Sequence, residues 1–178
     1  MILITTPFDF DKNIGKAYNQ VMNLLPSDND WAVLRDIDTL FLDNKAPQII
    51  KSAIEMKPET GLFTCYASRT GRGEQKYNQS ISNDPNIINH RKIALNNKRG
   101  TVSFKKILNP ISGFLMILQK KTWKEIGGFK EAGLLSIDLE FSRRILKSGK
   151  QILLIKNLYI FHYYRLMEGG VGYKEHLK

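Results

Sequence analysis

The sequence predicts one α/β domain with a mostly parallel central sheet and flanking helices. In residues 1–67, short apolar runs alternate with amphipathic helical patterns, which is typical of such a sheet. The chain has 178 residues, of which 42% are hydrophobic and 25% charged, so it can bury one core and is not disordered. Cys65 is the single cysteine. It excludes an internal disulfide and a cysteine-based zinc site, and a small buried hydrophobe is its expected role.

Three strands and two helices are expected in this first part of the chain. The patterns place the strands at residues 2–6, 31–35 and 61–67, and the helices at residues 14–25 and 46–56. Asn13 is the expected N-cap of the first helix, because its side chain can accept a hydrogen bond from the helical backbone. Pro47 fits the first turn of the second helix, where no backbone partner is lost.

The remaining chain begins with a polar insertion, residues 68–106, which contains a short helix around residues 87–96. The patterns then place a buried strand at 111–119, helices at 123–126 and 137–148, and two short strands at 151–155 and 158–162. Thr122 is the expected cap of the short helix, and Gly149 ends the longer one. Three glycines predict a flexible flap in the tail: Gly169, Gly170 and Gly172.

The net charge is +10, from 27 basic and 17 acidic residues, which favours anionic partners. Nucleic acid is not favoured, because no known module and no exposed aromatics interleaved with basic residues accompany the charge. The basic surface would suit peripheral contact with a membrane, but no apolar run approaches the length of about 18 residues that a membrane span needs. The first residues lack the basic segment of a signal peptide, so a cytoplasmic location is expected.

Asp36 and Asp38 point most directly to chemistry. They follow the apolar run of residues 32–34, and the strand period of two predicts that they share one face, about 7 Å apart along the backbone. Two such carboxylates repel each other unless a cation lies between or in front of them, and hard oxygen ligands suit Mg²⁺ or Mn²⁺. The alternative is that both acids simply mark the solvent-exposed end of a strand.

Four segments, in order, resemble glycosyltransferases of the GT-A fold, closest to family 2 and to the polypeptide N-acetylgalactosaminyl- and β-1,4-galactosyltransferases. Asp36-Ile37-Asp38 resembles their DxD motif, and residues 13–19 resemble the helix that precedes it. Residues 123–131 resemble an aromatic segment ending in GGFDE. Residues 137–149 resemble the following ED-x-D-L-x-x-R…G segment, and His162 matches a late histidine. The resemblance covers most of the chain.

This resemblance implies a metal-dependent, inverting hexosyltransferase. The donor would be a nucleotide diphosphate sugar, a UDP-sugar foremost, and the acceptor a hydroxyl of a carbohydrate or glycoconjugate. Mn²⁺ or Mg²⁺ would be the cofactor. Residues 1–67 would form the nucleotide-sugar and metal half of the domain, and residues 107–178 the acceptor and catalytic half.

The resemblance also implies roles for individual residues, each with a structural alternative such as a packed histidine, a first-turn acid or a core tryptophan. The implied roles are metal binding for Asp36, Asp38 and His162; nucleotide-sugar binding for Thr5, Pro7, Asp36 and Arg165; catalytic base for Asp138; and acceptor binding for Trp123, Gly127, Gly128 and Glu140.

Two departures from the family pattern are visible. Only one helix fits between the first strand and the acid-x-acid strand, so a strand–helix unit is missing, and Ile137 replaces the first acid of the family's ED pair. A non-catalytic basic module that binds acidic polymers or membrane surfaces is an alternative. A sugar-1-phosphate nucleotidyltransferase is less favoured, because residues 5–9 lack the glycine-rich, arginine-containing loop of that family.

Overall fold

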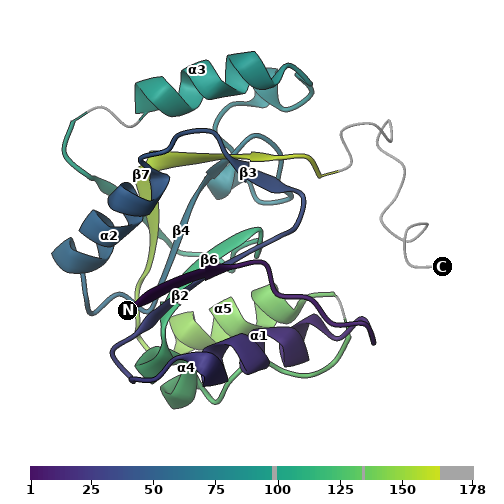
Figure 1. Ribbon diagram of the computed structural model, residues 1–178, viewed down its shortest axis with the longest axis vertical. Coiled ribbons are helices and arrows are strands. Elements are labelled where there is room, and N and C mark those ends of the chain that lie inside the picture. The colour runs from purple at the N-terminus through teal and green to yellow at the C-terminus, as the bar shows by residue number, and fades with distance from the viewer. Residues whose placement is uncertain (98–99, 134, 165–178) are drawn as a thin grey trace.

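The computed structural model describes residues 1–97, 100–133 and 135–164, which form a sheet flanked by helices (Figure 1). The helices are α1 (Ile14–Leu24), α2 (Ala46–Met56), α3 (Ile87–Asn97), α4 (Lys120–Ile126) and α5 (Ile137–Lys147). The strands are β1 (Ile2–Thr5), β2 (Trp31–Arg35), β3 (Thr39–Phe41), β4 (Leu62–Ala67), β5 (Phe104–Ile107), β6 (Leu115–Gln119) and β7 (Ile152–His162). Two 3₁₀ turns, Gly73–Gln75 and Gln79–Ile81, lie between β4 and α3.

Seven strands of the described residues form one sheet. Six of them lie in the order β1-β2-β6-β4-β7-β3, and the seventh, β5, pairs with β7. The β1–β2 and β4–β7 pairs are parallel. The other four pairings are antiparallel. The predicted α/β class is therefore confirmed, but the sheet is mixed and not purely parallel. The expectation of a mostly parallel sheet holds only for the β1–β2 and β4–β7 pairs. β6 lies antiparallel between β2 and β4, and β3 and β5, which were not predicted, pair antiparallel with β7.

Alternating side chains along β2 build a core on each face of the sheet. Trp31 and Val33 pack with residues of α2, whereas Ala32 and Leu34 pack with residues of α1 and α5. Figure 1 shows α1, α4 and α5 together on one side of the sheet and α2 on the other. Cys65 is fully buried in the α2-facing core, as a small hydrophobe should be.

Helix positions follow the local signals, with one cap misplaced. Asn13 Oδ1 accepts a hydrogen bond from Lys16 N at 3.1 Å and caps α1, as predicted. The predicted cap role of Thr122 is wrong, because α4 already begins at Lys120 and Thr122 is buried inside it. The strand predicted at 111–119 keeps only its second half, β6, and the residues before it form a loop.

The two short strands predicted at 151–155 and 158–162 are one strand, β7. Its pairing with β4 shifts in register, because Cys65 pairs with Ile155 but the next residue, Tyr66, pairs with Tyr159. Lys156 and Asn157, which separate the two predicted strands, lie at this break.

The predicted insertion at 68–106 contains the two 3₁₀ turns and α3, and its last residues enter β5 and so join the sheet. The predicted flap at Gly169, Gly170 and Gly172 lies outside the described residues. Within the ranges that are described, no helix combines the length and the apolar character required to cross a bilayer.

Candidate functional site

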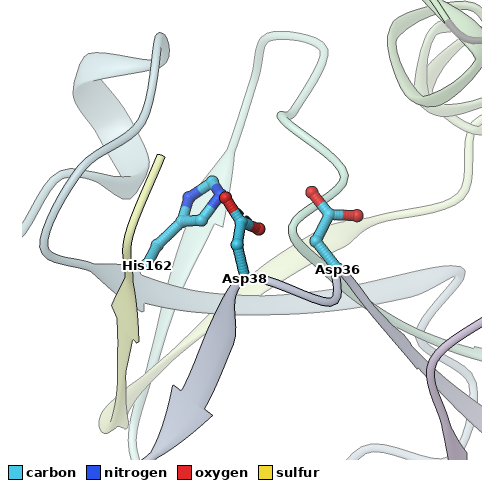
Figure 2. A group of neighbouring side chains, drawn as sticks. All are labelled: Asp36, Asp38 and His162. Carbon is cyan, nitrogen blue, oxygen red and sulfur yellow. Dashed lines mark ion pairs between the residues drawn. The ribbon is translucent and has the colours of Figure 1, made fainter. Parts of the chain in front are cut away.

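Asp36 and Asp38 lie in the tight turn between β2 and β3. Thr39 closes this turn, since its N–H donates to Asp36 O at 3.2 Å and its Oγ1 donates to the same carbonyl at 2.6 Å. The two side chains therefore lie on one side because the backbone turns. The predicted placement of both acids on one face of a strand is wrong. Figure 2 shows both carboxylates on the same side of the turn, with His162 beside Asp38.

His162 is the last residue of β7 and reaches the turn because it pairs with Thr39 in the sheet. Its N–H donates to Ser68 Oγ at 2.9 Å, and its Nδ1 lies 2.8 Å from Arg69 O. A carbonyl oxygen can only accept, so Nδ1 carries a proton and donates it to Arg69. The second ring nitrogen, Nε2, then faces Asp38 Oδ1 at 3.3 Å.

Together the three side chains form a candidate metal site. One ligand atom from each of Asp36, Asp38 and His162 lies within 4.8 Å of the other two. Because Nδ1 is protonated, a lone pair on Nε2 would face a carboxylate oxygen, and this contact requires either a second proton or a cation between them. Two carboxylates and an imidazole whose other nitrogen donates to a carbonyl fit the coordination of a divalent cation such as Mn²⁺.

Electrostatics in the site agree with this interpretation. Burial raises the pKa of the Asp36 carboxyl to about 6; the nearby His162 opposes the shift, while the charges of Asp38 and Asp138 add to it. Burial also raises the pKa of Asp38, but the hydrogen bond and the charge of His162 outweigh it, so that pKa lies below its usual value. The charges of two other carboxylates on buried Asp36 indicate a place where a cation would be stabilised.

Asp36 and His162 line a pocket of about 440 Å³ that also contains Asp138. Asp138 lies in the first turn of α5, and its Oδ2 accepts a hydrogen bond from Gly113 N at 2.7 Å. The volume lies within the range of roughly 300–1,000 Å³ that small-molecule sites occupy. The structure thus brings the predicted base and two of the predicted metal ligands into one pocket.

Gly113 allows the close approach of Asp138. A Cβ atom added at this glycine would lie 2.7 Å from Asp138 Cβ and 3.3 Å from Asp138 Oδ2. We expect Gly113→Ala to displace the Asp138 carboxylate and to lower the sugar transfer that the resemblance implies by about tenfold or more, since a misplacement of about 1 Å can cost a hundredfold. Steady-state kinetics would measure the effect. A variant that keeps the wild-type kcat would show that the reaction does not depend on the position of the Asp138 carboxylate. Gly71→Ala is the matched control, because nothing lies within 4 Å of a Cβ added there.

Gln75 links two loops of the site. One follows β4 and contacts His162 through Ser68 and Arg69, and the other contains Gly113, which contacts Asp138. The fully buried side chain of Gln75 donates to Thr64 Oγ1 at 2.8 Å and to Ser112 O at 3.0 Å, and its Oε1 accepts from Ser112 N at 2.7 Å. Ser112 precedes Gly113, so the 3₁₀ turn after β4 fixes the position of the residue that holds Asp138.

Three of the predicted acceptor residues lie elsewhere. Trp123, Gly127 and Gly128 line a separate hollow of about 370 Å³ beside α1. Trp123 Nε1 donates to Asn19 Oδ1 at 3.0 Å, and Gly127 ends α4 in the left-handed conformation, at φ +83°.

Glu140, the fourth predicted acceptor residue, is held by two cations. Its oxygens accept hydrogen bonds from Arg144 Nε and Nη2 at 2.9 and 2.8 Å, and Lys130 Nζ lies 3.3 Å from Oε1. Arg144 also donates to Gly128 O at 2.6 Å, so this group fixes the chain after α4. Glu140 is not among the residues that line the 440 Å³ pocket.

The predicted nucleotide residues lie at the same sheet edge as the pocket. Thr5 ends β1 and pairs with Leu34, so Thr5 and Pro7 lie beside the end of β2, where Asp36 follows. Neither residue is among those that line the pocket. Arg165 lies outside the described residues.

Sequence reasoning missed Tyr18, Ser112 and Gly113 as parts of the pocket, and Gln75 as the residue that links its two supports. Tyr18 is a buried residue of α1. Burial raises the pKa of its hydroxyl, and the charges of Asp36 and Asp138 raise it further. Ser112-Gly113 carries one local signal, a polar–glycine pair inside an apolar run, which is typical of a turn.

Comparison with known proteins identifies no family: no family model matches the chain, and no curated protein shows significant similarity to it.

Proposed function

We propose that this protein is a metal-dependent glycosyltransferase that moves a sugar from a nucleotide diphosphate sugar to a hydroxyl acceptor with inversion of configuration. The observation that carries the proposal is the convergence of Asp36, Asp38 and His162 at a pocket that also holds Asp138. These residues come from the β2–β3 turn, the end of β7 and the start of α5, so the fold gathers them from distant parts of the chain. The order of the motifs that resemble GT-A enzymes supports the same reaction.

Asp36, Asp38 and His162 would hold Mn²⁺ or Mg²⁺, with a UDP-sugar as the favoured donor. When bound, the cation would neutralise the negative charge that develops on the departing diphosphate. His162 is oriented for this role before any ligand binds, because its backbone is fixed by Ser68 and its ring by the Arg69 carbonyl.

Asp138 would take the proton of the acceptor hydroxyl. As the O–H bond breaks, the acceptor oxygen forms its bond to the anomeric carbon of the donor, and the bond from that carbon to the diphosphate breaks. The electron pair leaves with the nucleoside diphosphate, and the proton remains on Asp138. The hydrogen bond from Gly113 N to Oδ2 holds the carboxylate at the wall of the pocket throughout.

A panel of nucleotide diphosphate sugars, tested with and without Mn²⁺, tests this proposal. We expect one donor to raise the thermal midpoint of unfolding only when Mn²⁺ is present, because a ligand at 100 times its Kd stabilises the folded state by about 2.7 kcal/mol. The same donor should be hydrolysed slowly, with release of nucleoside diphosphate. A basic binding module without metal chemistry would give no Mn²⁺-dependent shift with any donor, and that result would overturn the proposal.

A further inference from the structure

Tyr18 brings a tyrosine hydroxyl to the wall of the pocket that contains Asp36 and Asp138. Only 4% of the residue is exposed, and its ring packs on that of Phe129, with 4.8 Å between the ring centroids. Ile14 lies four residues earlier, on the same face of α1, and lines the same pocket. The core therefore fixes the ring of Tyr18, and α1 presents this face to the pocket.

The hydroxyl of Tyr18 makes no hydrogen bond to any residue in the described ranges. Buried polar groups in folded proteins nearly always have a hydrogen-bond partner, so an exception in a pocket wall requires an explanation. Tyr159 shows the usual arrangement, since it is 3% exposed and its hydroxyl lies 2.6 Å from Nδ1 of His90. Tyr18 thus carries a hydrogen-bond donor that the described part of the protein does not use.

Two carboxylates lie within electrostatic reach of this hydroxyl. Burial raises the pKa of Tyr18, and the charges of Asp36 and Asp138 raise it further. The hydroxyl therefore stays protonated near neutral pH and is an uncharged donor. Asp36 belongs to the candidate metal site and Asp138 lies at the start of α5, so a ligand that contacts both carboxylates shares the pocket with the Tyr18 hydroxyl.

The same two charges select the kind of ligand group that this donor can bind. A phosphate or carboxylate placed here, away from a cation, would be repelled by Asp36 and Asp138. A neutral hydroxyl group, in contrast, can accept a hydrogen bond from Tyr18 and donate its own proton to a carboxylate. Sugars carry hydroxyl groups on adjacent carbons, so one sugar can satisfy the tyrosine and a carboxylate together.

We propose that Tyr18 is a substrate-binding residue whose hydroxyl donates a hydrogen bond to a hydroxyl oxygen of the transferred sugar. The inference rests on the proposed function. In that reaction the diphosphate lies at the metal site beside Asp36, and Asp138 acts where the acceptor attacks the anomeric carbon. The transferred sugar is the part of the donor that lies from one to the other, in the pocket that Tyr18 lines.

Tyr18→Phe tests the inference, because it removes one oxygen and keeps the ring that packs on Phe129. The probes are UDP-glucose, UDP-galactose and UDP-N-acetylglucosamine, each compared calorimetrically with UDP in the presence of Mn²⁺. For the sugar that binds, we expect the Kd to rise by about five- to tenfold, the scale of one hydrogen bond. The Kd of UDP should not change, because UDP lacks the sugar. The thermal midpoint of the ligand-free variant should not fall, since no hydrogen bond within the protein is lost.

Tyr159→Phe is the matched control. It removes the same atom from an equally buried tyrosine, but this hydroxyl contacts His90 and Tyr159 is not among the residues that line the pocket. We expect this variant to have a lower thermal midpoint and wild-type Kd values for both UDP and the UDP-sugar. The two tyrosine variants should therefore show opposite patterns of stability and binding.

Monodeoxy analogues of the bound UDP-sugar identify the oxygen that Tyr18 contacts. The analogue that lacks this hydroxyl should bind the wild type and Tyr18→Phe equally well, because neither complex can then form the hydrogen bond. The other analogues should still bind the wild type more tightly. If every analogue keeps the full difference between the two proteins, Tyr18 does not bind a sugar hydroxyl.

The failure of this inference differs from the failure of the proposed function. Equal affinity of wild type and Tyr18→Phe for the UDP-sugar would overturn the inference and leave the proposed function standing. An equal loss of affinity for UDP, or a lower thermal midpoint of ligand-free Tyr18→Phe, would also overturn it, because the hydroxyl would then act elsewhere. A wild type that binds none of the three UDP-sugars with Mn²⁺ would overturn the proposed function, and the assignment of Tyr18 to a sugar with it.

Discussion

Replacing Asp38 by alanine is expected to abolish Mn²⁺-dependent binding of UDP while leaving the fold intact. Asp38 supplies one of the three converging atoms of the candidate metal site, and its carboxylate faces His162 Nε2 at 3.3 Å. Loss of a direct ligand should lower UDP affinity, measured calorimetrically with Mn²⁺, by a factor of about 100 or more, since even indirect support of a ligand is worth 10- to 100-fold. The fold should persist because the contact from Tyr163 N to Asp38 O uses only the backbone.

Asp28→Ala is the control for this experiment. Asp28 pairs with Lys124 at 2.6 Å and precedes β2, so it lies at the opposite end of the strand that leads to Asp36. Its removal should leave UDP affinity unchanged. The metal site is contradicted if wild-type protein binds UDP equally well with and without Mn²⁺, or if Asp38→Ala binds it as tightly as the wild type.

Elements defined by local chemistry could be predicted from the sequence. The cap formed by Asn13 is an interaction within four residues, and the apolar stripes of α2 and α5 repeat at helical spacing. In contrast, β3 and β5 have three and four residues and no clear alternation. Each exists because it pairs with β7, more than forty residues further along the chain. Such pairings leave no local signal.

The candidate site was predicted in composition but not in geometry. Asp36, Asp38 and His162 were expected together, yet the two acids converge through a turn closed by Thr39 and not through strand periodicity. Gln75 could not be predicted, because a glutamine in a polar loop gives no sign that it will be buried. Its burial follows from hydrogen bonds to Thr64 and Ser112, which lie close only after the sheet has formed.

Replacing Asp138 by asparagine is expected to leave donor binding near its wild-type level and to lower sugar transfer by about a hundredfold or more, the usual scale for a positioned base. Asparagine is nearly isosteric and cannot take the proton of the acceptor. Its amide oxygen can still accept the hydrogen bond from Gly113 N that holds Asp138 Oδ2 at 2.7 Å, so the loop before β6 should keep its structure. The measurements are kcat for transfer and the Kd of the donor with Mn²⁺.

Glu140→Gln provides the comparison within the same helix. Arg144 and Lys130 hold Glu140 outside the pocket, so this change should affect the thermal midpoint more than kcat. If Asp138→Asn transfers sugar at the wild-type rate, Asp138 is not the base. If the Asp138→Asn variant loses donor binding instead, the assignment of Asp138 to the acceptor side of the pocket is wrong. A base that acts only on the acceptor hydroxyl has no contact with the donor diphosphate. A large fall in kcat confined to Asp138→Asn, with donor Kd unchanged, is the result that the proposed role of Asp138 requires.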